Sequence, residues 1–511
     1  MSGAILDLSQ APPPADLVVD VCVIGSGCGG GTAARVLAEA GREVVVLEEG
    51  GDRTGRQLTQ RDGEMYDQLY MDRGGRATSD LGVTVLQGRA LGGGGVINAC
   101  DVVPIADGVL RHWVERHGLT DFTPEALAPY RDLALQDLSA SRIADDQLNR
   151  PNALLRAGTE KLGWRGEVMM HNRVGCAGLG TCLIGCPIDA KRNPRFVSIP
   201  RAIEAGARFF TRARAVRIDD AEGELKTVTF RSLDARGYHE RDTFTLRART
   251  VILAANAIGS AQLLLRSGLG NDHVGRHLML QPQMPIIARF AERTDPFRGI
   301  PQSYAITEFE REDDPEHGLW GFRVEPVMGT PGIVSTLLPF QGAAGLEAMT
   351  GYAFMAAALL LVPDRPSGRV EVARDGRPVI RYTQREDHQR RIRAAAEAAA
   401  RAWLAAGAEE VFVPTLPPVS ARTDAEVTRF RDLRFRVAAA PLVSAHQQGA
   451  VRFAASEKHG AADPEGRVYG TRGVYVFDSS GFPSSASSHT MAPIITVSRY
   501  LCDRLLTRMR A

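Results

Sequence analysis

The stretch Val21-Cys-Val-Ile-Gly25-Ser-Gly27-Cys-Gly-Gly30 decides the fold of this chain of 511 residues. Its first part is apolar and rich in β-branched residues, which is typical of a buried parallel strand. Residues 29–40 have the pattern of a helix that ends at Gly41, and residues 43–47 form a second apolar run. A strand, a glycine turn, a helix and a strand in this order predict a βαβ unit.

Each glycine of this stretch has its own use in binding a dinucleotide. Gly25 permits the sharp turn out of the strand, Gly27 lets the backbone approach a pyrophosphate, and Gly30 lets the helix pack close to the strand. The free N–H groups at the helix start attract phosphates. Glu48, at the end of the second strand, is placed to accept hydrogen bonds from ribose hydroxyls. The motif predicts a dinucleotide without choosing between FAD and NAD.

Charge and composition narrow the class of protein. Lys plus Arg number 61 and Asp plus Glu number 60, so the net charge of +1 predicts no nucleic-acid partner. With 44% hydrophobic residues, the composition suits a globular protein of two large domains. We find no signal-peptide pattern and no apolar run long enough for a transmembrane segment, and seven scattered cysteines suit a reducing compartment. We therefore expect a cytoplasmic protein, with residues 1–16 as a loose polar tail.

The pattern of apolar, polar and glycine residues changes twice along the chain. Residues 1–280 combine strand-like runs with a mostly helical insertion at about 105–170. Residues 281–440 carry alternating strand-like runs and a long amphipathic helix, and residues 441–511 return to glycine turns, a buried strand and a final helix. We therefore predict an α/β fold in which 1–280 and 441–511 form one discontinuous Rossmann-type domain. The middle segment is then an inserted substrate domain of antiparallel sheet and helices.

Four separated segments share a pattern with one known family. They are the βαβ unit ending in Val46-Leu-Glu48-Glu-Gly50, Gly88-Arg-Ala-Leu-Gly-Gly-Gly-Gly-Val-Ile-Asn98, residues 251–270, and the C-terminal pair Ser444-Ala-His446-Gln and Val476-Phe-Asp478-Ser with Ser488-His489-Thr-Met. In this order they resemble the signatures of the glucose–methanol–choline (GMC) oxidoreductases. The chain resembles most the long-chain alcohol and sterol oxidase branches and the bacterial FAD-dependent sugar dehydrogenases.

The resemblance implies FAD as cofactor and assigns residues to it. The loop with Gly92, Gly93 and Asn98 would lie along the flavin ring, where bare glycine backbone permits close approach. The resemblance places Asp478 and Ser479 near the ribityl and pyrophosphate part, and the backbone near Ala215 at the adenine. The flavin loop lacks the histidine to which some relatives attach FAD, so we expect non-covalent binding.

The resemblance also implies the reaction, in which an alcohol loses hydride to flavin N5 and becomes a carbonyl. His446 would take the hydroxyl proton as a neutral imidazole, and His489 would hold the hydroxyl oxygen. Electrons would then pass to oxygen or to a separate acceptor partner. The small-molecule substrate stays open among fatty alcohols, sterols, sugars and aminoglycosides. The alternative is a redox-neutral flavoprotein of the same fold, as in hydroxynitrile lyases or photodecarboxylases.

A cluster of cysteines, Cys176-x5-Cys182-x3-Cys186, has three interpretations. We expect reduced thiols in a loop over the active site and no metal, because sequences like long-chain alcohol oxidases carry a similar pattern. The first alternative is an iron–sulfur site with Cys176, Cys182 and Cys186 as ligands, similar to some bacterial FAD glucose dehydrogenases. The second is a disulfide between Cys182 and Cys186.

Overall fold

A sheet of eight strands forms one half of the molecule, in a computed structural model that describes residues 3–220, 223–327, 329–486 and 488–510. Its strand order is β1 (Ala4–Asp7), β8 (Arg208–Thr211), β3 (Val44–Glu48), β2 (Val18–Ile24), β11 (Glu240–Leu253), β10 (Lys226–Leu233) and β9 (Ala213–Asp219), with β24 (Val474–Val476) also paired to β11. In this spatial order, each strand from β1 through β8, β3 and β2 to β11 pairs in parallel with the next, and β24 pairs in parallel with β11. Strand β10 pairs antiparallel with both β11 and β9. All five residues of β3 are buried, as the apolar run predicts.

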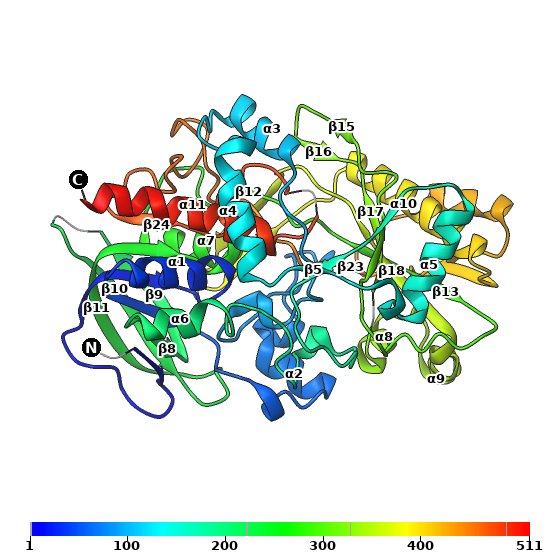
Figure 1. Cartoon of the computed structure of the whole chain (residues 1–511), viewed down its shortest axis with the longest axis horizontal. Coiled ribbons are helices and arrows are strands. Elements are labelled where there is room, and N and C mark those ends of the chain that lie inside the picture. The colour runs from blue at the N-terminus through cyan, green and yellow to red at the C-terminus, as the bar shows by residue number, and fades with distance from the viewer. Residues whose placement is uncertain (1–2, 221–222, 328, 487, 511) are drawn as a thin grey trace.

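Helices from both ends of the chain pack beside this sheet (Figure 1). Helix α1 (Cys28–Glu39) contacts α6 (Ser198–Glu204) and the C-terminal α11 (Met491–Arg510), and α7 (Asn256–Ser267) contacts β9. Because β24 and α11 join elements from the first half of the chain, the unit is discontinuous. The predicted α/β class with a Rossmann-type unit is thereby confirmed.

A second, antiparallel sheet forms the other half of the molecule. Its order is β22 (Val419–Ala421), β21 (Glu410–Val413), β13 (Met284–Arg289), β18 (Met355–Leu361), β17 (Arg323–Val327), β14 (Tyr304–Ile306) and β6 (Gly166–Val168). Helix α10 (Glu386–Ala405) packs on strands of this sheet, and α5 (Arg150–Lys161) packs on α10. The alternation of β18 leaves Ala358 and Leu360 in the core and turns Ala357 and Leu359 toward a cavity.

Smaller elements complete the chain. The short strands are β12 (Arg276–Leu278), β19 (Gly368–Val372) and β20 (Pro378–Arg381) in one sheet, and the pairs β4 (Val83–Val85) with β23 (Leu442–Ser444), β5 (Ser141–Arg142) with β7 (Met170–His171), and β15 (Glu312–Asp314) with β16 (Leu319–Trp320). The remaining α-helices are α2 (Asp62–Leu69), α3 (Asp107–His117), α4 (Pro124–Asp137), α8 (Pro331–Leu337) and α9 (Gly342–Thr350).

Two segments depart from the expectations. The prediction of a loose tail at residues 1–16 is wrong where the structure describes it, because β1 pairs with β8 in parallel from Ala4 to Asp7, and residues 1–2 lie outside the described residues. The antiparallel sheet also draws an edge strand, β6, from outside residues 281–440, where it pairs with β14. In both cases an edge strand is defined by its partner, and its own sequence carries little signal.

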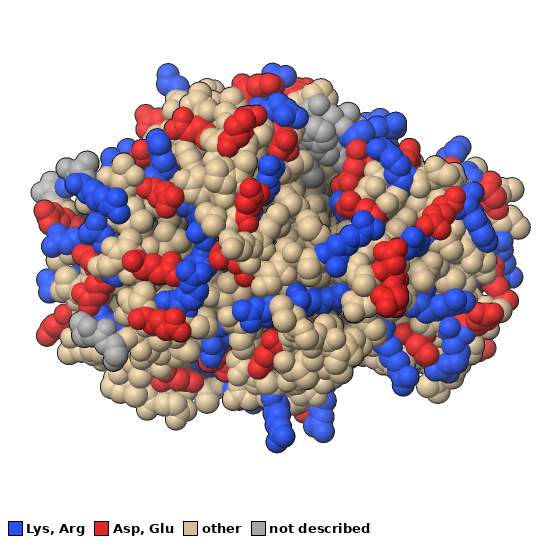
Figure 2. All heavy atoms as spheres, in the orientation of Figure 1, with Lys and Arg blue, Asp and Glu red and all other residues tan. Residues whose placement is uncertain are grey.

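The surface shown in Figure 2 carries positive and negative side chains interspersed over the whole face, in keeping with the net charge of +1. Within the described ranges, the structure contains no helix that is both long and apolar enough to cross a membrane.

Candidate active site

A cavity of about 1790 Å³ lies between the two sheets. One wall consists of the carboxyl ends of β2, β3, β11 and β24, where open α/β sheets bind their ligands. The opposite wall is apolar and includes Pro285 and Ile287 of β13 and Leu359 and Leu361 of β18. The volume exceeds the roughly 300–1,000 Å³ of most small-molecule sites, so the cavity has room for a dinucleotide and a substrate together.

The glycine turn after β2 fits a phosphate-bearing ligand. Gly25 has φ of +99°, and a Cβ there would lie 2.3 Å from the carbonyl oxygen of Ala254. A Cβ on Gly30 would lie 1.9 Å from the carbonyl oxygen of Gly25, so only glycine lets α1 pack this close. No side chain caps the first N–H groups of α1 at Gly27, and its first turn holds no acidic residue. These N–H groups are therefore available to phosphate oxygens.

The second glycine loop packs directly on the first. Gly92 has φ of +104°, and its N–H donates to the hydroxyl of Ser26 at 3.0 Å. A Cβ on Gly93 would lie 2.6 Å from the Cα of Gly27, so the two backbones touch because neither residue has a side chain. Gly93 and Asn98 line the cavity, and the Asn98 side chain reaches the sulfur of Met491 at 3.1 Å.

The other residues expected at the dinucleotide lie along the same cavity. Its lining includes Gly25, Gly27, Glu48, Ala215, Asp478 and Ser479. Gly30 and Gly92 do not line the cavity themselves. Glu48 binds the glycine turn itself, because its carboxylate accepts from the N–H and hydroxyl of Ser26 and from the N–H of Gly50 at 2.7–3.0 Å. Asp478 accepts from the hydroxyl of Ser260 at 2.7 Å. Its role toward a ligand remains a prediction.

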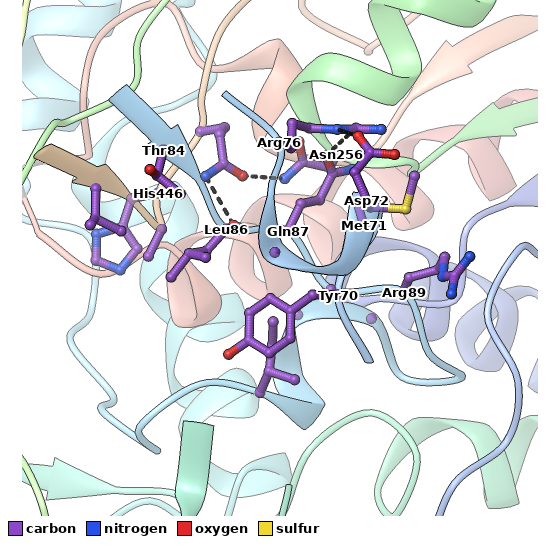
Figure 3. A pocket seen from close by; sticks show the side chains of 18 of the residues that line it. Tyr70, Met71, Asp72, Arg76, Thr84, Leu86, Gln87, Arg89, Asn256 and His446 are labelled. Atoms are coloured by element: carbon purple, nitrogen blue, oxygen red, sulfur yellow. Dashed lines mark hydrogen bonds and ion pairs between the residues drawn. The ribbon is translucent and has the colours of Figure 1, made fainter. Parts of the chain in front are cut away.

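His446 faces the cavity in an uncharged, amide-lined environment. It follows β23 and stands beside Thr84 and Leu86 in Figure 3. Its Nδ1 lies 2.7 Å from Oε1 of Gln281, and Nε2 of Gln283 is 3.1 Å from the same nitrogen. The shorter contact joins Nδ1 to an amide oxygen, which favours the tautomer with the hydrogen on Nδ1 and a lone pair on Nε2 over the one in which Nδ1 accepts from Gln283. Burial and the neighbouring His489 lower the pKa of His446 to about 3.

His489 lies close by in a carboxylate environment. The two imidazole rings are 5.0 Å apart between centroids and nearly perpendicular, at 75°. Nε2 of His489 is 2.8 Å from Oε2 of Glu325, and its Nδ1 is 4.0 Å from Oδ2 of Asp101. Burial favours the neutral ring, but the charges of Glu325 and Asp101 outweigh it and raise the pKa of His489. The surroundings therefore favour the neutral ring at His446 and the protonated ring at His489.

The carboxylate of Glu325 is held by two residues besides His489. Its Oε1 is 3.0 Å from Nε of Arg323, and its Oε2 also accepts from the Gln302 amide at 3.1 Å. Burial opposes ionisation, yet His489, Arg323 and Gln302 together hold the pKa of Glu325 at about 2. A permanently charged carboxylate therefore orients the His489 ring.

The sequence analysis missed Asp101, Glu325, Gln281 and Gln283. A usable signal existed for Glu325, because charged residues inside an apolar strand-like run at 323–327 are rarely buried without a partner. Asp101 directly follows the second glycine loop, which also marks it. The two glutamines carry no pattern of their own, since only the fold brings them to His446.

Comparison with known proteins identifies the family. Residues 66–283 and 364–498 match the GMC oxidoreductase family, and residues 23–86 match an NAD(P)-binding Rossmann-like domain. An uncharacterised GMC-type oxidoreductase of Mycobacterium tuberculosis is 32% identical over 508 residues, covering 98% of this chain and 78% of that protein. This chain belongs to the GMC oxidoreductase family. The resemblance inferred from its motifs is confirmed, and membership implies a flavoprotein.

Other relatives of this GMC oxidoreductase are more distant. The long-chain-alcohol oxidase FAO4A of Arabidopsis thaliana is 26% identical over 512 residues, covering 96% of this chain and 68% of that protein. The structure of pyridoxine 4-oxidase from Mesorbium loti superposes with a TM-score of 0.71 at 17% identity, covering 96% and 99% of the two chains. A formate oxidase of Aspergillus oryzae superposes with a TM-score of 0.70 at 15% identity, covering 98% and 100%. The structures share the fold.

The cysteines of the predicted cluster do not form a three-sulfur site in this GMC oxidoreductase. Among the residues that the structure describes, Cys176, Cys182 and Cys186 do not bring their sulfurs to one point as metal ligands would, and all are free thiols. The Cys182–Cys186 disulfide is therefore not present. Cys182 instead forms a hydrogen bond with Cys100. This hydrogen bond and the positive charge of Lys191 outweigh burial and lower the pKa of Cys182 to about 6. Lys191 donates to the Cys182 carbonyl at 2.8 Å and ties this loop to the second glycine loop.

Proposed function

We propose that this protein oxidises an alcohol to a carbonyl, with FAD held non-covalently in the large cavity. The observation that carries the proposal is the pair of rings His446 and His489, which lie 5.0 Å apart and whose surroundings shift their pKa values in opposite directions. Oxidation of a CH–OH group needs one group that accepts the hydroxyl proton and one that stabilises the oxygen. The two rings meet both needs.

The dinucleotide would be held by the wall that the glycine loops form. The pyrophosphate would meet Gly25, Gly27 and the start of α1, and the remaining contacts would come from Glu48, Ala215, Gly93, Asn98, Asp478 and Ser479. FAD bound there supplies the acceptor for the hydride that leaves the alcohol carbon.

The proton chemistry follows from the hydrogen bonds of the two rings. His446 donates from Nδ1 to Gln281, so its Nε2 accepts the proton of the substrate hydroxyl. His489 has its Nε2 bonded to Glu325, while Nδ1 is too far from Asp101 for a hydrogen bond. That N–H is free to bind the substrate oxygen as negative charge develops on it.

The apolar wall favours a substrate with a long hydrocarbon body. Besides the strand residues, α8 contributes Ile333, Val334 and Leu337 to the cavity. Burying these surfaces against a chain is worth about 0.8 kcal/mol for each CH₂ group. Relatives named long-chain-alcohol oxidases support the same class. We propose a long-chain primary alcohol ahead of a sterol, a sugar or an aminoglycoside.

The test is an absorption spectrum of the purified protein under anaerobic conditions, before and after a fatty alcohol, a sterol, glucose or an amino sugar is added. We expect a flavin spectrum that the fatty alcohol bleaches, and admitting air then shows whether oxygen restores it. Denaturation should release the flavin into the supernatant, because it is not covalently bound. A flavin that no alcohol bleaches would favour redox-neutral chemistry, and a protein that retains no flavin would end the proposal.

A further inference from the structure

A second cavity of about 450 Å³ adjoins the large one, with which it shares Gly63, and Arg89 lines only the large cavity. It is lined by Arg53, Gly63, Glu64, Asp67, Gln68, Arg212, Ala235 and Arg236. Arg53 and Arg212 border this cavity and do not line the large one. Its walls therefore present positive charge that the alcohol chemistry does not use.

Arg212 is the most unusual of these residues. It is only 3% exposed, yet neither its Nε nor its Nη1 has a hydrogen-bond partner. Its guanidinium occupies a slot between two glycines, since a Cβ on Gly51 would lie 2.7 Å from Nη2 and a Cβ on Gly237 would lie 2.4 Å from Nη1. A buried charge without a partner is costly, so such groups are almost always paired.

The backbone of Arg212 is also held in an uncommon conformation. Its φ of +57° lies in the left-handed region, which few residues other than glycine adopt. The conformation is fixed from both sides, because its N–H donates to the carbonyl of Gly50 and its carbonyl accepts from the N–H of Leu233. Strain of this kind is frequent where a side chain must be aimed at a ligand.

Two further guanidinium groups add to the positive charge. The Nε atoms of Arg53 and Arg89 are likewise buried without a partner. Burial and the charges of Arg53 and Arg89 lower the pKa of Arg212. Arg89 is held in place by the carbonyl of Gly237, which its Nη1 reaches at 2.7 Å. Three like charges in a poorly solvated place repel one another unless an anion joins them.

The nearby carboxylates are engaged with other groups. Glu64 accepts from the Thr59 hydroxyl at 2.7 Å and from Arg61 at 3.0 Å. Asp67 pairs with Arg73 at 3.1 Å and accepts from the Tyr238 hydroxyl at 2.9 Å. Asp7 and Asp234 offset part of the charge on Arg212, but burial and the charges of Arg53 and Arg89 outweigh them, so an excess of positive charge remains.

We propose that Arg53 and Arg212, backed by Arg89, bind a phosphate group in this second cavity. The planar fork of a guanidinium matches two phosphate oxygens, and a dianion offsets more of the charge than a carboxylate can. The volume of about 450 Å³ is that of a small-molecule site, which fits a phosphate monoester with a small organic part. The proposal does not depend on the alcohol reaction.

The test measures thermal unfolding of the full chain with FAD bound, in a buffer free of phosphate. Inorganic phosphate and glycerol phosphate should each raise the unfolding temperature, by roughly 2 °C at about 100 times the dissociation constant. Sodium chloride at equal ionic strength should not. A calorimetric titration compares the two ligands directly. Tighter binding of glycerol phosphate would identify an ester as the ligand, whereas equal or weaker binding would identify inorganic phosphate.

Variants decide whether the guanidinium groups are responsible. Arg212→Met and Arg53→Met should each abolish the phosphate-induced shift, whereas Arg56→Met, an exposed arginine on the same loop as Arg53, should keep it. Without phosphate, Arg212→Met should unfold no earlier than the parent, because it removes repulsion. If Arg212→Met does not fold, Arg53→Met carries the test. The proposal fails if phosphate gives the parent no shift, if chloride matches it, or if the shift survives in Arg53→Met.

Discussion

The two sides of the active site shift the pKa of a histidine in opposite directions. On one side, two neutral amides, Gln281 and Gln283, surround His446, and burial lowers its pKa to about 3. On the other side, Glu325 and Asp101 raise the pKa of His489 despite its burial. The same residue type is thus pushed toward its neutral form in one place and toward its protonated form 5.0 Å away. The difference teaches that the partners around each ring, rather than the ring, set its function.

Removing the ring on the amide side should have the largest effect. His446→Ala should keep FAD but slow flavin reduction by an alcohol at least ~100-fold, because no other group accepts the hydroxyl proton. Anaerobic stopped-flow absorbance measures this rate. His459→Ala removes an exposed histidine outside the cavity and should leave the rate unchanged. Undiminished reduction in His446→Ala would sink its assignment as the base.

Neutralising the carboxylate side should have the next largest effect. Glu325→Gln should slow flavin reduction roughly 10- to 100-fold, because His489 loses the charge that keeps it protonated. Glu310→Gln is the matched control, since Glu310 also pairs with Arg323, at 3.1 Å, while it is Glu325 that pairs with His489. Equal losses in both variants would mean that Arg323, and not His489, is what the carboxylate serves.

Removing the hydrogen bonds between the glutamine amides and His446 should have a smaller effect on the rate of flavin reduction. Gln281→Leu should slow flavin reduction about tenfold, the value of one hydrogen bond of roughly 1.4 kcal/mol, because Nδ1 of His446 loses its acceptor. Gln283→Leu should slow flavin reduction less, since the Gln283 amide nitrogen lies 3.1 Å from Nδ1 of His446, whereas the Gln281 amide oxygen lies 2.7 Å from it. If Gln283→Leu proves the more damaging, the tautomer assigned to His446 is wrong.

The pH dependence should show the smallest change. His446 has its pKa lowered to about 3, so it stays neutral and active as pH falls to about 5. His489 has a raised pKa, so its protonated form persists to higher pH than that of an ordinary histidine and is lost as pH rises through that raised pKa. The rate of flavin reduction should therefore hold as pH falls into the weakly acidic range and decline as pH rises through the pKa of His489. In Glu325→Gln this decline should move to lower pH, and an unmoved limb would show that His489 does not control it.

Most of the dinucleotide side could be predicted because its signals are local. The turn at Gly25, the helix after Gly27 and the buried strand ending at Glu48 are set by residues within thirty positions of one another. Edge strands such as β1 and β6 were unpredictable, because their pairing depends on partners far along the chain, at Arg208–Thr211 and Tyr304–Ile306.

The amino-acid order was enough to identify the family, the α/β class and the two histidines at the cavity, since short motifs carry each of them. Only the tertiary structure decided the charge on those histidines, because Asp101, Glu325 and His489 meet from three distant parts of the chain. It also placed Cys182 against Cys100 and gathered Arg53, Arg89 and Arg212. The physical reason is that burial and Coulomb interactions depend on distance in space, which spacing along a sequence does not report.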